Sequence, residues 1–196
     1  MSEALYDAHD DPACYPGTRV LRNIPGLREP EDLEQYEAMS FALRALQPLP
    51  AGRFGLSHYR AIHRHLFGDV YRWAGRFRTV RISKPGAAFC FPEHIDAQMR
   101  ELFERLRRGN RLRGLDREAF AAEAAAFLAW LNHIHPFREG NGRTQMTFMA
   151  ALAAQAGHPL NLEVLEEARF LDAMIQSFHG DEAPLRGQLL ALIDHG

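Results

Sequence analysis

The feature that most constrains the fold of this chain is a series of segments in which apolar residues recur every three or four positions. The clearest segment covers residues 92–109, where Pro92 opens the pattern and Gly109 closes it. Its apolar positions are Ile95, Met99, Leu102, Phe103 and Leu106. This period is that of an amphipathic α-helix with one face in a core, and proline and glycine are common at its two ends. The segment therefore predicts a core helix.

Six further segments have the same period and are bounded by similar residues, so the chain predicts about seven helices. They are residues 30 to about 47, 57–68, 116–135, 141–156, about 163–178 and 181 to about 192. Ser57 and Asp116 are the expected N-caps of their helices, and Gly68 is expected to end its helix in a left-handed conformation. Asp181 and Pro184 open the last helix.

One segment has a different period. Residues 77–83 alternate in twos, Lys84-Pro85-Gly86 forms a turn signal, and residues 89–91 resume an extended pattern. This predicts a β-hairpin flap over residues 77–91. Residues 1–29 are rich in turn formers and predict an irregular entry segment. The expected fold class is all-α, with one inserted hairpin in a single domain of residues 1–196.

Composition limits the classes of function. The chain has 196 residues, 46% of them hydrophobic, which suits one globular domain. A formal net charge of -2 gives no global attraction to nucleic acid or to an anionic membrane, so nucleic acid is not an expected partner. No apolar run is long enough for a signal peptide or a membrane span. The two cysteines lack metal-site spacing and suit a reducing compartment, which favours the cytoplasm.

The chemistry is concentrated in residues 135–143. Gly140-Asn141-Gly142 stands where a loop becomes a helix, so free backbone N–H groups and the helix dipole predict a phosphate site. Arg143 adds a forked charge suited to phosphate, although the dipole disfavours a cation there. Glu139 is tolerated beside an anion if Mg²⁺ lies between them. His135 is the nearby group able to accept a proton at neutral pH.

Each of these features alone has an ordinary structural interpretation. A glycine-asparagine-glycine turn is more often a simple helix junction, and a lone histidine is more often structural. The pairs His63/His65 and His133/His135 lack the spacing of a helical zinc pair, and surface or capping roles suffice for them. An arginine cluster at residues 105–113 fits a solvated helix end. The combination within nine consecutive positions favours a functional site.

The loop resembles the signature of the Fic family, His-x-Phe-x-(Asp/Glu)-Gly-Asn-Gly-Arg. It is matched at His135, Phe137, Glu139, Gly140, Asn141, Gly142 and Arg143. Residues 70–75, followed by the predicted hairpin, are similar to the family's segment leading into its target-binding flap.

The resemblance implies a protein adenylyltransferase of all-helical fold. ATP would bind with Mg²⁺ on Glu139, and His135 would deprotonate a Ser, Thr or Tyr hydroxyl that receives AMP. The glycine amides, Asn141 and Arg143 would hold the departing diphosphate, and Phe137 would anchor the loop in the core. Lys84 and Gly86 in the hairpin would hold the target by strand addition.

The sequence departs from the family pattern at Met146, where a second arginine usually contacts the γ-phosphate. Transfer of UMP, phosphocholine or phosphate therefore stays open, and so does a weakened nucleotide-binding or partner-binding module without catalysis. The family's inhibitory helix motif is absent; Ser177 with Asp181 comes nearest and does not match. The resemblance then implies control by a separate antitoxin-like chain.

Overall fold

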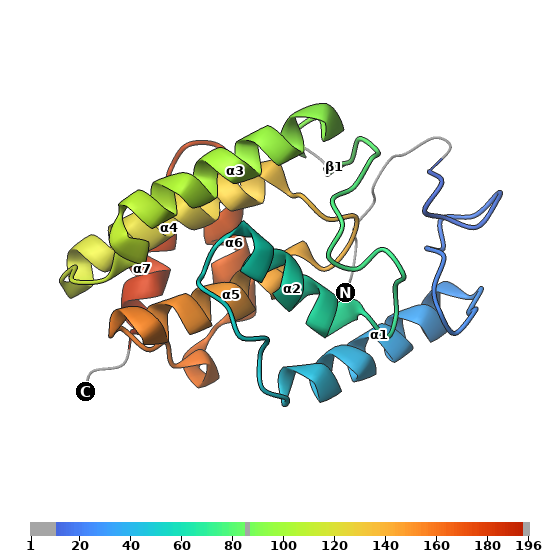
Figure 1. The fold of residues 1–196 in the computed structure, drawn as a ribbon, viewed down its shortest axis with the longest axis horizontal. Helices are drawn as coiled ribbons and strands as arrows, with labels where there is room; N and C mark the ends of the chain where they lie inside the picture. The colour runs from blue at the N-terminus through green and yellow to red at the C-terminus, as the bar shows by residue number, and fades with distance from the viewer. Residues whose placement is uncertain (1–10, 85–86, 194–196) are drawn as a thin grey trace.

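A computed structural model describes residues 11–84 and 87–193 and places seven α-helices among them (Figure 1). They are α1 (Pro30–Ala45), α2 (Leu56–Phe67), α3 (Pro92–Arg108), α4 (Arg117–Ile134), α5 (Asn141–Ala156), α6 (Glu167–Phe178) and α7 (Ala183–Leu192). Two short 3-10 helices, η1 (Asn110–Leu112) and η2 (Leu162–Val164), and two short strands, β1 (Ser83–Lys84) and β2 (Ala87–Ala88), complete the elements. The all-helical prediction is confirmed.

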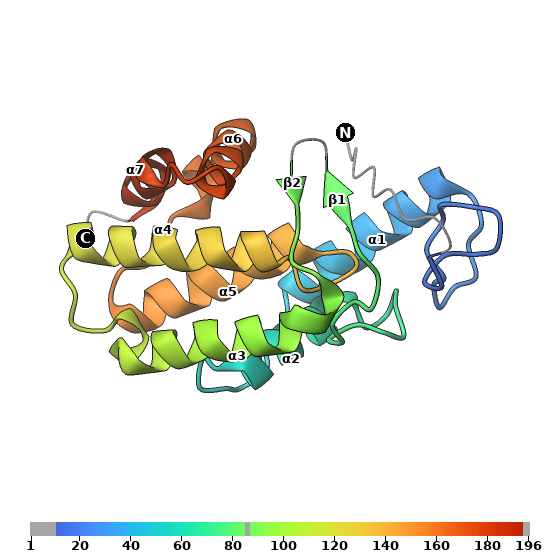
Figure 2. The same ribbon diagram turned by 90° about the horizontal axis from the view of Figure 1, so that it is seen from above.

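The central element is α4. It contacts α3 and α5 on one side, and α6 and α7 form a further layer against its other side (Figure 2). Phe120, Leu128 and Leu131 of this helix are fully buried. Alanines at 121, 124 and 125 are buried as well, and their small side chains let the neighbouring helices approach closely. The carboxyl end of this central helix leads directly into the predicted site.

Several predicted helix ends are confirmed by their caps. The Asp116 side chain accepts a hydrogen bond from the Ala119 N–H at 2.9 Å, which caps α4. Gly157 follows α5 with a φ of +92°, the left-handed conformation that glycine adopts readily. The Asp181 side chain accepts from the Ala183 N–H at 3.1 Å, and Pro184 lies in the first turn of α7.

Other predicted ends are wrong. Gly55, rather than Ser57, is the N-cap of α2, and Ser57 lies inside the helix. Gly68 has a φ of -66°, because the chain continues into a turn in which the Val70 N–H bonds to the Phe67 carbonyl. Helix α6 begins at Glu167 rather than near residue 163, since η2 occupies part of the expected first turn.

The hairpin is much shorter than the predicted residues 77–91. Its ladder pairs Ser83 with Ala88 and Lys84 with Ala87. The turn residues Pro85 and Gly86 lie outside the described residues. Outside the ladder, backbone groups of the two arms bond to the end of α4 and the loop after it: the Arg78 N–H donates to Pro136 at 2.9 Å and the Cys90 N–H donates to His133 at 3.2 Å. A hairpin of the predicted extent is therefore not confirmed.

The entry segment is irregular where the structure describes it. An isolated bridge pairs Cys14 with Leu21, and both side chains are buried in the main core. Asp11 forms a buried ion pair with Arg138 of the predicted site, with 2.5 Å between the Asp11 Oδ2 and Arg138 Nε atoms. Within residues 11–84 and 87–193, no helix has the length and apolar character needed to cross a membrane.

Candidate active site

His135 directly follows the last residue of α4 and ends the helix in a left-handed conformation, with φ 48° and ψ 63°. Its N–H donates to the Leu131 carbonyl at 3.0 Å, and the following Pro136 disfavours a continued helix. The imidazole is 5% exposed and stacks on the Phe89 ring, with 3.9 Å between centroids and 15° between planes. A non-glycine residue in this conformation costs roughly 1–2 kcal/mol, so the neighbouring contacts must hold it.

Phe137 is fully buried. Its ring centroid lies 3.7 Å from that of His63 and 5.5 Å from that of Tyr59. The side chain thus anchors the loop in the core. The ring therefore supports the loop from within the core, and a contact of Phe137 with a bound nucleotide stays a prediction.

Asn141 closes the loop on itself. Its Oδ1 accepts from the Phe137 N–H at 2.9 Å, and its Nδ2 donates to the Phe137 carbonyl at 2.8 Å. The residue is 2% exposed. Both polar atoms of the amide therefore form hydrogen bonds within the loop, and the side chain fixes the loop's shape. The expected contact of Asn141 with a diphosphate stays a prediction.

The two glycines of the turn have different surroundings. Gly140 has a φ of +78°, and a Cβ atom there would lie 2.5 Å from the Phe67 ring. Gly142 lies in the first turn of α5, and a Cβ atom there would meet nothing within 4 Å. The first N–H groups of a helix have no acceptor within it, so the open space beside Gly142 is where an anion can approach them.

Arg143 is held in place by an acidic residue of α1. Its guanidinium forms an ion pair with Glu37, and its Nη2 lies 3.5 Å from Oε1 of Glu139. The Glu37 carboxylate also accepts a hydrogen bond from the Tyr71 hydroxyl. The guanidinium carbon lies 4.7 Å from the centroid of the Phe67 ring, a favourable position for a cation.

Glu139 joins this group of charges. Its Oε1 accepts from the Gly140 N–H at 2.8 Å. Removal from water and the nearby charge of Glu37 raise the pKa of the Glu139 carboxyl above its usual value. A cation at this position would relieve both effects.

His63 supports the loop from α2 and is fully buried, so the interpretation of this residue as a surface or capping histidine is wrong. Its Nδ1 accepts from the Gly75 N–H at 2.9 Å, which requires the proton to be on Nε2. Nε2 then donates to the Glu139 carbonyl at 2.9 Å. Burial lowers the pKa of His63 to about 4, so the neutral ring is the stable form at neutral pH.

Three supporting residues were missed by the sequence interpretation: Glu37, His63 and Arg78. Each is a polar side chain at a position where the periodicity of its segment predicts an apolar residue. Glu37 follows Leu33 by four residues on α1, and Arg78 has the same parity as Ile82 in the alternating segment. Polar side chains on an inward face are uncommon and mark such positions.

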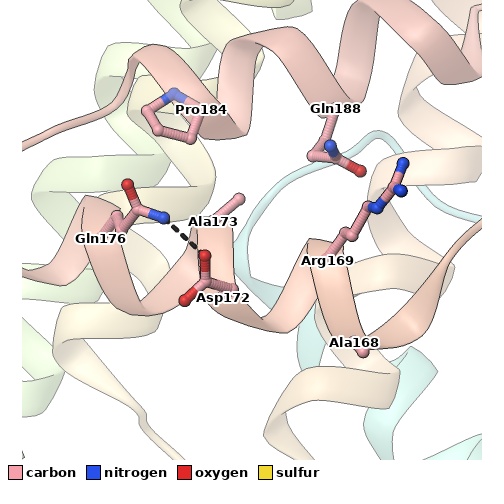
Figure 3. Close-up of a pocket in the computed structure, with 7 residues that line it drawn as sticks. All are labelled: Ala168, Arg169, Asp172, Ala173, Gln176, Pro184 and Gln188. Carbon is pink, nitrogen blue, oxygen red and sulfur yellow. Dashed lines mark hydrogen bonds between the residues drawn. The ribbon is translucent and has the colours of Figure 1, made fainter.

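Of the two predicted hairpin residues, Lys84 lies in β1 and pairs with Ala87, and Gly86 lies outside the described residues. A pocket of about 340 Å³ lies between α6 and α7, and Figure 3 shows the residues that line it. It is lined by Ala168, Arg169, Asp172, Ala173, Gln176, Pro184 and Gln188. No residue of the 135–143 loop lines this pocket, so it is not part of the candidate site.

The fold and the loop define a class of helical protein in which a histidine at a helix end is followed, five residues later, by the first glycine of a turn that opens the next helix. Residues 53–153 match the model of the Fic/DOC family, and the chain belongs to this family. It is 48% identical over 189 residues to "Probable protein adenylyltransferase y4lH" of Sinorhizobium fredii, covering 96% of this chain and 98% of that protein.

More distant relatives agree. "Protein adenylyltransferase VbhT" of Bartonella schoenbuchensis is 36% identical over 90% of this chain and 37% of its own length. Among solved structures, the N-terminal Fic domain of a VirB-translocated effector from Bartonella quintana with bound ADP has a TM-score of 0.83 and 30% identity, covering 93% of this chain and 94% of that one. BepC of Bartonella tribocorum with bound AMPPNP also has a TM-score of 0.83, at 26% identity, covering 93% and 96%.

Proposed function

We propose that this protein transfers AMP from ATP to a Ser, Thr or Tyr hydroxyl of a target protein. The observation that carries the proposal is that one loop, closed by Asn141, holds His135 at a fixed place relative to the free N–H groups of α5. The names of the relatives as protein adenylyltransferases and the adenine nucleotides bound in the similar structures support it.

The residues of the loop would take the following parts in the transfer step. His135 accepts the proton of the target hydroxyl as that oxygen bonds to the α-phosphorus. The bond between the α-phosphorus and the oxygen that bridges to the β-phosphate breaks, and diphosphate leaves with the bonding electrons. The N–H groups at the start of α5 and the Arg143 guanidinium stabilise the negative charge on the phosphates.

Mg²⁺ fits the acidic group at Glu139. Within the described part of the chain, no cluster of three or more His, Cys, Asp or Glu residues could hold a metal on its own. Mg²⁺ commonly binds through one or two carboxylates together with substrate phosphates, which is what a single glutamate beside a phosphate site offers. Bound there, Mg²⁺ would neutralise charge on the phosphates, and Glu139 is the residue that would hold it.

Met146 bears on the choice of donor. It is partly buried against the main core and supplies no charge for a terminal phosphate. UMP, phosphocholine and phosphate donors therefore remain alternatives for the same site. The short ladder of β1 and β2 is the segment that would hold an extended stretch of the target, and regulation would fall to a separate antitoxin-like chain. The two free cysteines fit a cytoplasmic protein.

The test uses the full chain with Mg²⁺ in a cell extract and compares ATP labelled on the α-phosphate with ATP labelled on the γ-phosphate. AMP transfer labels a protein band only from the α-position, whereas phosphate transfer labels it only from the γ-position. His135→Ala removes the band, and His133→Ala, at an exposed histidine two residues earlier, keeps it. A wild-type protein that binds nucleotide but labels nothing with ATP, UTP or a choline donor would show a binding module instead.

A further inference from the structure

We propose that Arg78 is the positioning residue that holds His135 and both arms of the hairpin in one arrangement, and so places a target hydroxyl against the histidine. The inference rests on the proposed function, because it assigns Arg78 a part in the transfer step. Its basis is one buried guanidinium that bonds to three separate segments of the chain.

The guanidinium of Arg78 donates to four backbone carbonyls. Nε bonds to His135 at 2.9 Å and Nη2 bonds to Ile134 at 3.2 Å, both at the carboxyl end of α4. Nη1 bonds to Val80 at 2.7 Å in the arm before β1. Nη2 also bonds to Cys90 at 2.5 Å in the arm after β2. The last helical turn and both hairpin arms therefore meet at one side chain.

The buried position at the end of α4 favours a cation, and the number of carbonyls around it favours arginine over lysine. Arg78 is 5% exposed, and a buried charge is costly unless its donors are satisfied. The carbonyls at the end of α4 have no partner within the helix and lie at the negative end of its dipole. A planar guanidinium with five donors can bond in several directions at once, whereas a lysine ammonium acts as a point charge with three donors.

The pose of His135 depends on Arg78 in two ways. The His135 carbonyl, in a left-handed residue that its surroundings must hold, is fixed by Nε of Arg78. The imidazole stacks on Phe89, the residue immediately before Cys90, and the Cys90 carbonyl is fixed by Nη2. Loss of the guanidinium would therefore release the backbone of the histidine and the ring that it stacks on.

The residues proposed to bind the nucleotide, which we call the nucleotide half of the site, are held by contacts that do not involve Arg78. Asn141 closes the loop through Phe137, and Arg143 is held by Glu37 of α1. None of the four carbonyls bonded to Arg78 belongs to this half. Figure 2 shows the hairpin strands standing beside the end of α4, and Figure 1 shows β1 and α1 on opposite sides of the molecule. Arg78 thus affects where the target and the base lie, while nucleotide binding is left to other residues.

The experiment compares Arg78→Ala, Arg78→Lys and Arg81→Ala with the wild-type chain. Arg81 is an exposed arginine of the same arm and serves as the matched control. Three quantities are measured: the rate of AMP transfer to target, the affinity for ATP by calorimetry, and transfer by Arg78→Ala with millimolar ethylguanidinium added. A misplacement of about 1 Å at a reacting group costs on the order of 10²-fold in rate, which is the loss expected for Arg78→Ala.

Arg78→Lys is expected to transfer at a rate between those of Arg78→Ala and wild type, since lysine replaces only part of the bonding. Ethylguanidinium raises the rate of Arg78→Ala and leaves that of Arg81→Ala unchanged. ATP affinity stays at the wild-type value in all variants. An unchanged transfer rate in Arg78→Ala overturns the proposal. A parallel loss of ATP affinity in both Arg78 variants, or their failure to fold, overturns it too, because Arg78 would then support the fold as a whole.

Failure of the proposed function can be told apart from failure of this inference. A wild-type chain that labels no protein with any donor removes the adenylyltransferase assignment. Hydrogen exchange then tests the arrangement by itself: Arg78→Ala should speed exchange at the Cys90 and His135 amides, which bond to His133 and Leu131, and leave the Thr144 amide unchanged. If all three amides exchange in Arg78→Ala at their wild-type rates, Arg78 does not hold the arrangement.

Discussion

The active-site loop of residues 135–143 and the neighbouring strands β1 and β2 are stabilised by different kinds of contact. Short-range hydrogen bonds close the loop, in addition to the contacts that Glu37 and His63 make with it: Asn141 bonds to Phe137 in both directions, and Thr144 of α5 donates to the Gly140 carbonyl through both its N–H and its hydroxyl. The hairpin has a ladder of two residue pairs, and its arms depend on Arg78 and the end of α4.

Under the proposed function, these two kinds of contact suit two functions: phosphate binding by the loop and target binding by the hairpin. A loop that binds phosphate must present its N–H groups in a fixed geometry, and local contacts supply that geometry. Under the same proposal, the short ladder of β1 and β2 would take up an extended stretch of the target by strand addition. Substitutions at the packed or hydrogen-bonded loop residues Gly140 and Asn141 should therefore lower the free energy of unfolding, and substitutions around the hairpin should mainly lower transfer to the target.

The largest loss of stability is expected for Gly140→Ala. The new Cβ atom would lie 2.5 Å from the Phe67 ring, and φ at this position is +78°. A left-handed conformation costs about 1–2 kcal/mol for alanine, and overpacking adds roughly 1–3 kcal/mol. Urea denaturation should show a loss of roughly 2–5 kcal/mol.

Gly142→Ala is the matched control for that variant. A Cβ atom there meets nothing within 4 Å, and the residue is helical. Alanine in a helix should raise stability by about 0.5–1 kcal/mol relative to glycine. ATP affinity should fall nevertheless, because the methyl group points into the space proposed for phosphate. Equal stability losses in the two variants would refute the distinction between a packed and an open glycine.

Stability should also depend on pH through His63. The pKa of this histidine is lowered from 6.5 to about 4, so the unfolded chain binds its proton first as the pH falls. The stability that the neutral ring contributes is complete above about pH 6.5 and is lost progressively down to about pH 4. The total change is roughly 3 kcal/mol.

His63→Gln isolates this contribution. A glutamine amide can accept from Gly75 and donate to Glu139 without titrating. The raised pKa of Glu139 acts in the opposite direction, since the folded state then binds that proton first, and it is present in both proteins. The difference in unfolding free energy between wild type and His63→Gln should therefore change between pH 7 and pH 4. A pH dependence of the unfolding free energy that is the same in His63→Gln as in wild type would contradict the assignment.

Asn141→Ala should cost less than Gly140→Ala. It removes two hydrogen bonds of 2.9 and 2.8 Å and leaves the buried N–H and carbonyl of Phe137 without these partners. A buried polar group that loses its partner costs about 1–3 kcal/mol, and water entering the space left by the side chain lowers the sum. Denaturation should show a loss of roughly 2 kcal/mol together with weaker ATP binding. Normal stability with weak ATP binding would instead indicate that Asn141 contacts the nucleotide.

The sequence predicted those parts of the molecule that depend on nearby residues. Helices α3, α4 and α5 follow from period and caps, and the loop residues follow from the motif they share with the Fic family. The Asp116 cap forms as predicted because it needs only the N–H of Ala119, three residues away. Interactions of this range are visible in a sequence.

The parts that were not predicted depend on contacts distant in sequence. Glu37 meets Arg143 across 106 residues, and the Nε2 of His63 meets the Glu139 carbonyl across 76. The length of the hairpin was overestimated for the same reason, because alternation cannot show that Arg78 bonds to residues near the end of α4. Polar residues on apolar faces indicate that such partners exist, but the sequence does not name them.

The smallest effect on stability is expected where the hairpin meets α6. Ile82 and Phe89 form a separate small cluster, and Phe178 at the end of α6 packs against it. The Phe178 ring meets Phe89 edge to face at 5.7 Å, and Phe89 in turn stacks on His135. Phe178→Leu keeps an apolar side chain and removes the aromatic contact, which should cost only about 0.5–1.5 kcal/mol.

The rate of AMP transfer to the target should fall by more than this small loss of stability implies, because the His135 imidazole stacks on the Phe89 ring. ATP affinity, measured by calorimetry, should not change. Leu171→Ala, at an exposed residue of the same helix, provides the control and should alter neither quantity. If Phe178→Leu weakens ATP binding as much as it lowers the rate of transfer, the hairpin and the loop of residues 135–143 act as one unit. The assignment of separate functions to them would then be wrong.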